Sequence, residues 1–350
     1  SPSSFVYNIH SMAVYNDIIA IIEFGNDYKL YLYKFNGEDK PISKITDKII
    51  DKALLNINIK GSTSPNSPQA KIMDCFMNDK NIYLLCNCYT KYSPYVSTGT
   101  ILKVSYTEEK ETLNIGQAIK LIGKDEYVAK NNIVNVLDET KELYRPMKFV
   151  GFDEDVLYIA DDGVVREYEG GVIQLIKNKN RLVCFNLKDE KIFIENKDSN
   201  IETWMPENMA ITKINGTIFF SYDRKGINDV AKIKIFDGSK FAKFDNTDVL
   251  TIENPDTTLV YVFDSSGNFY VRTKDGNNVD ILKKYSPYKT ENGIEYKENT
   301  EFKGDRLPDV ISSNSILSLY YDGMQKHLYY KVGHDLYKLV ENSWVLVDKG

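Results

Sequence analysis

The densest group of carboxylates in the chain lies in residues 145–171, RPMKFVGFDEDVLYIADDGVVREYEGG. Asp153 and Asp155 precede a short apolar run, and Asp161 and Asp162 follow it. Paired carboxylates can act as general acid and base in glycoside hydrolysis when the fold brings them to the right separation. The alternative is that they are turn and pairing residues of a hairpin, since Asp-Gly is a preferred turn pair.

The strand pattern favours the hairpin. A turn at Asp162 and Gly163 would place Asp161 diagonally across from Arg166, within reach of the long arginine side chain. Asp162 would lie in the turn itself, so the two carboxylates would not point at one substrate. We therefore expect structural roles for Asp161, Gly163 and Arg166.

Metal chemistry finds little support in the sequence. In the expected hairpin HLYYKVGHDLYK, His327 and His334 would lie roughly 20 Å apart, too far to share a metal ion. The segment 263–280 has aspartates beside glycines, but it lacks the donor spacing of a twelve-residue calcium loop, so we interpret it as two turns. The cysteines lack the partners of a zinc site, and we expect buried or half-buried free thiols, with a bridge from Cys75 as the alternative. The four cysteines are Cys75, Cys86, Cys88 and Cys184. We expect no metal and no cofactor.

Two loop-rich segments contain candidate binding residues. Tyr92 and Tyr95 lie in KYSPY, downstream of the serine-rich stretch GSTSPNSPQA, and binding residues are often carried on loops. A propeller enzyme would instead bring carboxylates together at a central channel, and YDRKGIND contains the residues to test there: Asp223, Arg224 and Asp229. The sequence contains no Gly-x-Ser-x-Gly elbow, Walker loop or His-Glu-x-x-His motif, so no residue is assigned as catalytic.

Strands must position these residues, because the helical period is almost absent outside residues 44–56 and 127–144. A polar residue, an apolar residue, a large apolar or aromatic residue and another apolar residue recur together along the chain. Several of these anchors are followed by a second strand, a tight turn and a third strand, and most are preceded by another apolar run. The seven anchors are Ile19, Tyr83, Tyr158, Phe193, Phe219, Tyr270 and Tyr329.

Four antiparallel strands repeated at a loose period are typical of a β-propeller blade. We predict an all-β, single-domain β-propeller of seven four-stranded blades, or of six if the short fourth unit is not a blade. Phe193 and Phe219 lie only 26 residues apart, so this fourth blade would lack its outermost strand. The expected blades span residues 5–60, 70–122, 145–178, 181–205, 208–245, 257–303 and 310–349, with an insertion at 108–142.

The carboxylate-rich segment resembles the NHL repeat of β-propellers. The resemblance rests on Pro146, Asp153, Asp155 where a glycine is usual, the run LYIAD that ends in Asp161, and Arg166 five residues later. It covers one blade. It implies that the aspartate and the arginine are structural, in agreement with the hairpin interpretation.

The composition limits the partners and the location. A net charge of −6 without a basic stripe argues against nucleic acid. No apolar run approaches the ~18 residues of a membrane-spanning helix. The start at Ser1 is compatible with an exported protein, periplasmic or at the cell surface, whose leader or lipid anchor has been removed. We predict a monomeric, non-catalytic module that binds a protein or glycan partner through loops on one face. The alternative is a propeller hydrolase or lyase that acts on a carbohydrate.

Overall fold

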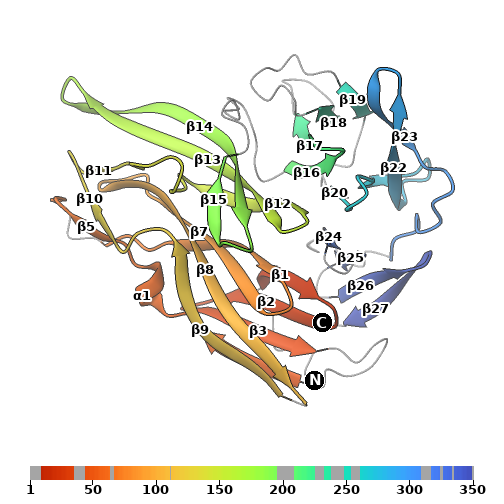
Figure 1. Cartoon of the computed structure of the whole chain (residues 1–350), viewed down its shortest axis with the longest axis horizontal. Helices are drawn as coiled ribbons and strands as arrows, with labels where there is room; N and C mark the ends of the chain where they lie inside the picture. The colour runs from red at the N-terminus through yellow and green to blue at the C-terminus, as the bar shows by residue number, and fades with distance from the viewer. Residues whose placement is uncertain are drawn as a thin grey trace.

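Six of the seven sequence anchors lie on the second strand of a sheet in the computed structural model (Figure 1). The rings of Tyr83, Tyr158 and Tyr329 are almost fully buried. Their strands are buried along most of their length, as expected for apolar runs that have neighbours on both faces. The anchor pattern therefore marks the second strand of each sheet.

The second and third of the first three sheets contain the longest strands. The first is β1 (Ile9–Tyr15), β2 (Ile18–Phe24), β3 (Tyr28–Lys34) and β4 (Lys44–Ile49). The second is β6 (Lys71–Met77), β7 (Asn81–Tyr89), β8 (Tyr95–Glu109) and β9 (Thr112–Ile122), with β11 (Ile133–Val134) added to β8. The third is β12 (Pro146–Asp153), β13 (Val156–Glu169), β14 (Val172–Asn186) and β15 (Lys191–Phe193).

The last three sheets have four antiparallel strands each. The fourth is β16 (Met209–Ile214), β17 (Thr217–Arg224), β18 (Lys232–Asp237) and β19 (Asp248–Glu253). The fifth is β20 (Tyr261–Phe263), β21 (Phe269–Lys274), β22 (Asp280–Thr290) and β23 (Gly293–Glu298). The sixth is β24 (Leu317–Asp322), β25 (His327–Val332), β26 (Asp335–Val340) and β27 (Ser343–Asp348).

The all-β propeller prediction is confirmed within the residues that the structure describes. The expected blades 145–178 and 181–205 are wrong as separate units, because β14 runs from one into the other and β15 pairs with it. Phe193 lies on this fourth strand, which explains its short spacing to Phe219. The described residues are 9–34, 44–63, 67–110, 112–194, 209–224, 232–237, 248–253, 261–308, 317–323, 326–332 and 335–348.

The first strands of the six sheets form an inner ring. In the order β1, β6, β12, β16, β20 and β24, each strand contacts the next. Met12 and Ile19 of the first sheet pack in one cluster with Tyr329 and Leu336 of the sixth. The sheets at the two ends of the chain therefore pack against each other.

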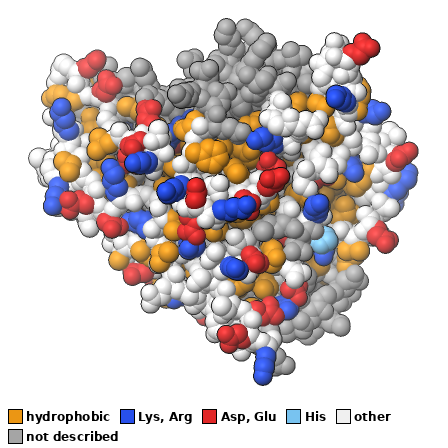
Figure 2. All heavy atoms as spheres, viewed as in Figure 1, with side chains coloured by type: hydrophobic (Ala, Val, Ile, Leu, Met, Phe, Trp, Pro, Cys, Tyr) orange, Lys and Arg blue, Asp and Glu red, His pale blue; other side chains and the backbone are white. Residues whose placement is uncertain are grey.

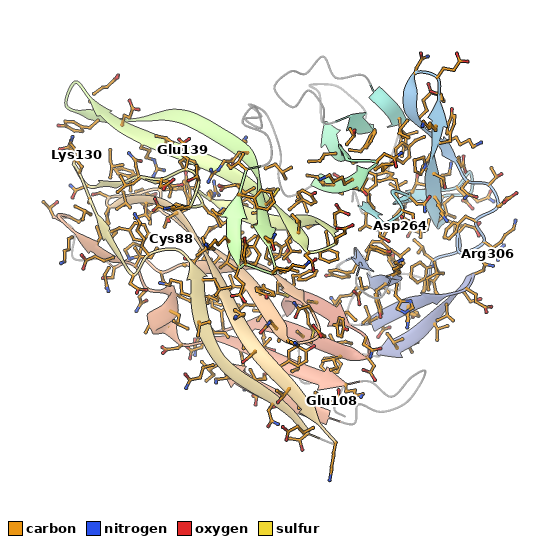
Figure 3. All side chains as sticks on the ribbon, in the orientation of Figure 1. Cys88, Glu108, Lys130, Glu139, Asp264 and Arg306 are labelled. Atoms are coloured by element: carbon orange, nitrogen blue, oxygen red, sulfur yellow. The ribbon has the colours of Figure 1, made fainter. Side chains whose placement is uncertain are left out.

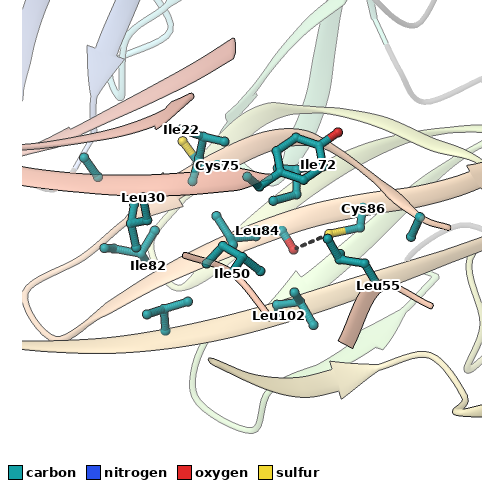
Figure 4. Close-up of a cluster of buried hydrophobic side chains, with 14 of the residues drawn as sticks. Ile22, Leu30, Ile50, Leu55, Ile72, Cys75, Ile82, Leu84, Cys86 and Leu102 are labelled. Carbon is teal, nitrogen blue, oxygen red and sulfur yellow. Dashed lines mark hydrogen bonds between the residues drawn. The ribbon is translucent and has the colours of Figure 1, made fainter. Parts of the chain in front are cut away.

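A second cluster joins the first two sheets (Figure 4). Ile22 and Leu30 of the first sheet pack with Ile82, Leu84 and Leu102 of the second. Three cysteines belong to this cluster and the fourth to a neighbouring one. All four are free and buried, so the thiol prediction is confirmed and the alternative bridge is wrong.

The two segments with a possible helical pattern contain little helix. Residues 44–56 form β4 and one short helix, α1 (Lys52–Leu55), whose first turn is capped by the Asp51 carboxylate. Residues 127–144 contain two short strands instead. Of these, β10 (Glu126–Val128) pairs in parallel with β5 (Asn58–Lys60), and β11 pairs in parallel with β8. Within the described residues, no helix is long and apolar enough to cross a membrane.

Candidate functional site

The chain over Val156–Glu169 is one strand, β13, so the expected turn at Asp162 and Gly163 is wrong. The reversal comes at Gly170 and Gly171, whose φ values of 59° and 80° glycine adopts without strain. Gly163 lies inside the ladder. The run that was expected to be a complete hairpin therefore forms only the first arm of a longer one.

Asp161 is a buried carboxylate with three donors. The backbone N–H groups of Tyr144 and Arg145 donate to it at 3.0 and 2.7 Å, and Arg181 Nε donates at 3.0 Å. Its charged partner is therefore Arg181, directly opposite on β14, and the predicted pairing with Arg166 is wrong. The contacts hold the backbone at 144–145 against the third sheet.

The loop after β11 is built around the same arginine. Arg181 also donates to the backbone carbonyls of Glu139 and Glu142. The Glu142 carboxylate accepts from the backbone N–H groups of Leu137 and Asp138 at 3.1 and 2.7 Å. Side chains thus satisfy the loop's backbone groups, which fixes its conformation.

Two arginines lie against one tyrosine ring beside this loop. The guanidinium carbons of Arg145 and Arg166 are 4.0 and 5.1 Å from the centroid of the Tyr89 ring. Arg166 also lies 4.7 Å from the centroid of Tyr95, and it donates to the Tyr89 hydroxyl at 3.1 Å. Arg166 is buried, whereas 29% of the Arg145 side chain is exposed. Contact with aromatic faces orients a guanidinium group without neutralising it.

These residues border what we call the side lobe: the loop 90–94, the segment 124–145, and the hairpin of β13 and β14 from 162 to 180. It extends from the propeller at the upper left of Figure 1, where Figure 2 shows hydrophobic side chains interspersed with Lys and Arg. The four most exposed large hydrophobic side chains of the described residues belong to it. They are Leu137 (82%), Tyr92 (81%), Val128 (72%) and Val172 (60%).

Some residues singled out in the sequence meet at this lobe. Tyr92 lies on its loop, and Tyr95 and Arg166 are in contact beside it. Sequence reasoning missed Tyr89 and Arg145. Their only signals are a tyrosine at the end of a long apolar strand and an arginine just before a proline, and neither pattern is specific.

The other predicted binding residues are not brought to this lobe. Asp223 and Arg224 end β17 in the fourth sheet, and their side chains lie outside the described residues. Asp229 lies outside them altogether, as does His334 of the expected hairpin. The expected position of Asp223, Arg224 and Asp229 at a channel mouth stays a prediction.

A second candidate site lies at the inner ring. The first strands of all six sheets line a cavity of about 500 Å³. On its wall, the Asp74 carboxylate accepts from the backbone N–H groups of Cys75 and Phe149 at 2.9 Å each and from the Ser11 hydroxyl at 3.2 Å. Burial raises the pKa of Asp74. This carboxylate connects three sheets, and the protein itself supplies its donors.

The segment 263–280 forms two aspartate-capped turns, as expected. The Asp264 carboxylate, labelled in Figure 3, accepts from the backbone N–H groups of Ser266 and Asn268 at 2.9 Å each. Asp275 accepts from the backbone N–H of Val279 at 3.0 Å in the same way. No group of three or more His, Cys, Asp or Glu side chains that could hold a metal occurs in the described part of the chain.

Comparison with known proteins gives a family match for part of the chain. Residues 52–209 match the model of the TdpA C-terminal domain. They run from α1 through β15 and include the whole side lobe. The matched family is not an NHL repeat, so the NHL-type resemblance of residues 146–166 stays a prediction.

One curated relative is the 53 kDa membrane antigen A of Treponema denticola. It is 33% identical over 101 residues, which cover 29% of this chain and 20% of the relative. The match therefore spans about a fifth of the length of that protein.

Solved structures that resemble the chain share little sequence with it. A mutant of Trypanosoma rangeli sialidase displaying trans-sialidase activity has a TM-score of 0.43 at 12% identity, and the match covers 97% of this chain and 53% of that one. AofleA from Arthrobotrys oligospora has a TM-score of 0.45 at 9% identity, covering 99% and 89%. Likeness at this level carries no statement about function.

Proposed function

We propose that this chain is a non-catalytic binding module of an exported or cell-surface protein, and that its side lobe binds a protein partner. The observation that carries the proposal is that the four most exposed large hydrophobic side chains of the described residues all belong to the lobe. Single exposed hydrophobic residues are ordinary, but a concentration of them on one part of a surface is typical of an interaction site.

The composition of the lobe supports a protein partner over a glycan. Leu137, Val128 and Val172 are aliphatic and strongly exposed, and aliphatic contacts suit the buried centre of a protein interface. Tyr92 and the partly exposed Arg145 add two of the residue types that most often dominate interface energies. A glycan would be the favoured partner if binding required only the tyrosines and arginines of the lobe and not its aliphatic side chains.

The rigidity of the lobe supports the same proposal. Arg181, Glu142 and Asp161 fix the loop after β11, so Leu137, which lies on this loop, is presented on an ordered backbone. A surface ordered before binding has less conformational entropy to lose on association.

The alternative is a propeller hydrolase or lyase that uses carboxylates at the inner-ring cavity. It is favoured by one observation, that Asp74, Asp264 and Asp322 come from three different sheets and all line the cavity. Asp74 and Asp264 are each occupied by donors from the protein, which supports the binding module over the enzyme.

The location and repeat type are part of the proposal. The relative in Treponema denticola is called a membrane antigen, which supports an exported or surface position for this chain. We also keep the NHL-type repeat as a proposal for residues 146–166, and a monomeric state for the module.

Site-specific photo-crosslinking tests the proposed function. A photoreactive residue replaces Leu137 in one variant and Val279, exposed and far along the chain in the fifth sheet, in a control variant. We expect one protein of the producing organism's envelope to crosslink at position 137 and not at 279. Equal crosslinking at both positions, or binding to a glycan array with no protein crosslinked at 137, would contradict the proposal.

A further inference from the structure

The inner-ring cavity is large enough for a small molecule. Its volume of about 500 Å³ falls within the roughly 300–1,000 Å³ typical of ligand pockets. Residues from the first strands of all six sheets line it, and none from the side lobe does. The cavity is therefore a separate site from the lobe.

Rings and thioethers dominate the wall. Four tyrosines, four phenylalanines and four methionines line the cavity. The Phe76 ring is stacked on Phe152 at a centroid distance of 5.2 Å and meets Phe149 edge-on at 6.4 Å. Such a wall favours an apolar body, and the faces of aromatic rings attract cations.

Acidic side chains outnumber basic ones on the cavity wall. Asp74, Asp264 and Asp322 line the cavity, against Lys148 as the only basic side chain among its described lining residues. Lys148 lies near Asp74. Burial raises the pKa of Asp74, and the charge of Lys148 opposes part of this rise. Asp264 and Asp322 lie on other sheets, so the excess negative charge collects on the side of β20 and β24.

Tyr321 marks this acidic side. Its hydroxyl is 2.8 Å from the Ser265 hydroxyl, in a hydrogen bond between the two sheets. Burial, and after it the charges of Asp264 and Asp322, raise the pKa of Tyr321, while the hydrogen bonds with Ser265 lower it. Both carboxylates therefore act on one aromatic side chain of the wall.

We propose that the cavity binds a small organic cation, with its apolar body against the rings and thioethers and its ammonium group on the side of Asp264 and Asp322. A cation interacts favourably with both the carboxylates and the ring faces. A neutral ligand of the same shape has only the rings, and the carboxylates oppose an anion.

Three probes of similar shape and different charge test the inference: benzyltrimethylammonium, benzyl alcohol and benzoate. Each is titrated into the full chain, and its dissociation constant is measured by NMR or calorimetry. We expect the cation to bind at least about tenfold more tightly than the alcohol, and the benzoate to bind most weakly.

Three variants separate charge from packing. Lys148 is exposed and is the basic side chain of the wall. Lys148→Gln should tighten binding of the cation about threefold to tenfold and leave the dissociation constant of the alcohol unchanged. Asp322→Asn should weaken binding of the cation by a similar factor. Lys303→Gln makes the same charge change at an exposed position outside the wall and should leave all three constants unchanged.

Several outcomes would overturn the inference. They are equal affinities for cation and alcohol, tighter binding of benzoate, no binding of any probe at millimolar concentration, and no tightening by Lys148→Gln. Asp322 is buried, so its variant is used only if its melting curve matches that of the parent. If that variant does not fold, Lys148→Gln and its Lys303 control decide the question.

Discussion

The Arg181 guanidinium donates to the Asp161 carboxylate at 3.0 Å in an ion pair whose side chains are 4% and 0% exposed. The same two side chains bind the backbone of residues 139 to 145, so the pair joins the third sheet to the loop of the side lobe. Removing one member of such a pair leaves the other charge buried without compensation.

Asp161→Ala should therefore lower the free energy of unfolding by about 3 to 5 kcal/mol, measured by urea denaturation. Asp155→Ala is the matched control, because Asp155 makes a solvent-exposed ion pair with Lys188 that is worth at most ~1 kcal/mol. Equal effects of the two substitutions, or lost partner binding at unchanged stability, would overturn the structural assignment of Asp161.

Arg166→Met should loosen the loop that carries Tyr92. Arg166 donates to the Thr90 carbonyl at 2.7 Å, and methionine would leave this contact unmade at a cost of about 1 to 3 kcal/mol. Hydrogen exchange of the amides at 89–96 should become faster, while exchange in the fourth to sixth sheets stays unchanged. Glu167→Gln, at an exposed neighbouring position, is the control and should leave the loop as it is.

Gly151→Ala should weaken packing between the third and fourth sheets. A Cβ at Gly151 would lie 2.6 Å from the backbone oxygen of Ile211, a contact that β12 or β16 would have to move to relieve. We expect a loss of about 1 to 3 kcal/mol in thermal or urea unfolding. Gly276→Ala has no atom within 4 Å and should be neutral or slightly stabilising. A similar loss in both variants would show that close packing is not the cause.

The cysteines should be unreactive in the folded protein. All four are buried, and burial raises the pKa of the Cys88 thiol to about 12, so little thiolate is present at neutral pH. A colorimetric thiol reagent should detect almost none before unfolding and four in denaturant without reductant. A count of two in denaturant would reveal a disulfide and contradict the structure.

His327 should make the folded state less stable in mild acid. Partial burial, and then the charge of Lys338, lower the pKa of His327 in the folded state below the ~6.5 of the unfolded chain. The unfolded state then binds more protons between these two values, so stability falls as pH decreases through that window. The melting temperature of His327→Gln should therefore rise relative to the parent below about pH 6.5, with no further pH dependence of the difference above pH 7. A difference that does not change with pH would contradict the shift.

The side lobe shows why sequence reasoning placed some residues and missed others. Tyr92 and Tyr95 stood out because proline and serine beside them predict a loop. Arg181 did not, because its importance comes from a long strand that aligns it with Asp161, and Arg145 did not, because it acts on the ring of Tyr89 in another sheet. Strand register depends on the pairing of a whole hairpin, and the Asp-Gly pair inside β13 is a local turn signal that this pairing overrides.

The sequence by itself determined the all-β propeller and the second strand of each sheet. A strand with neighbours on both faces must be apolar along most of its length, and that pattern is local. Only the tertiary structure decided that residues 145–193 form one sheet, that Asp161 pairs with Arg181, and that six inner strands enclose a cavity. These relationships join residues that are distant in sequence, where register and packing between sheets determine which side chains meet.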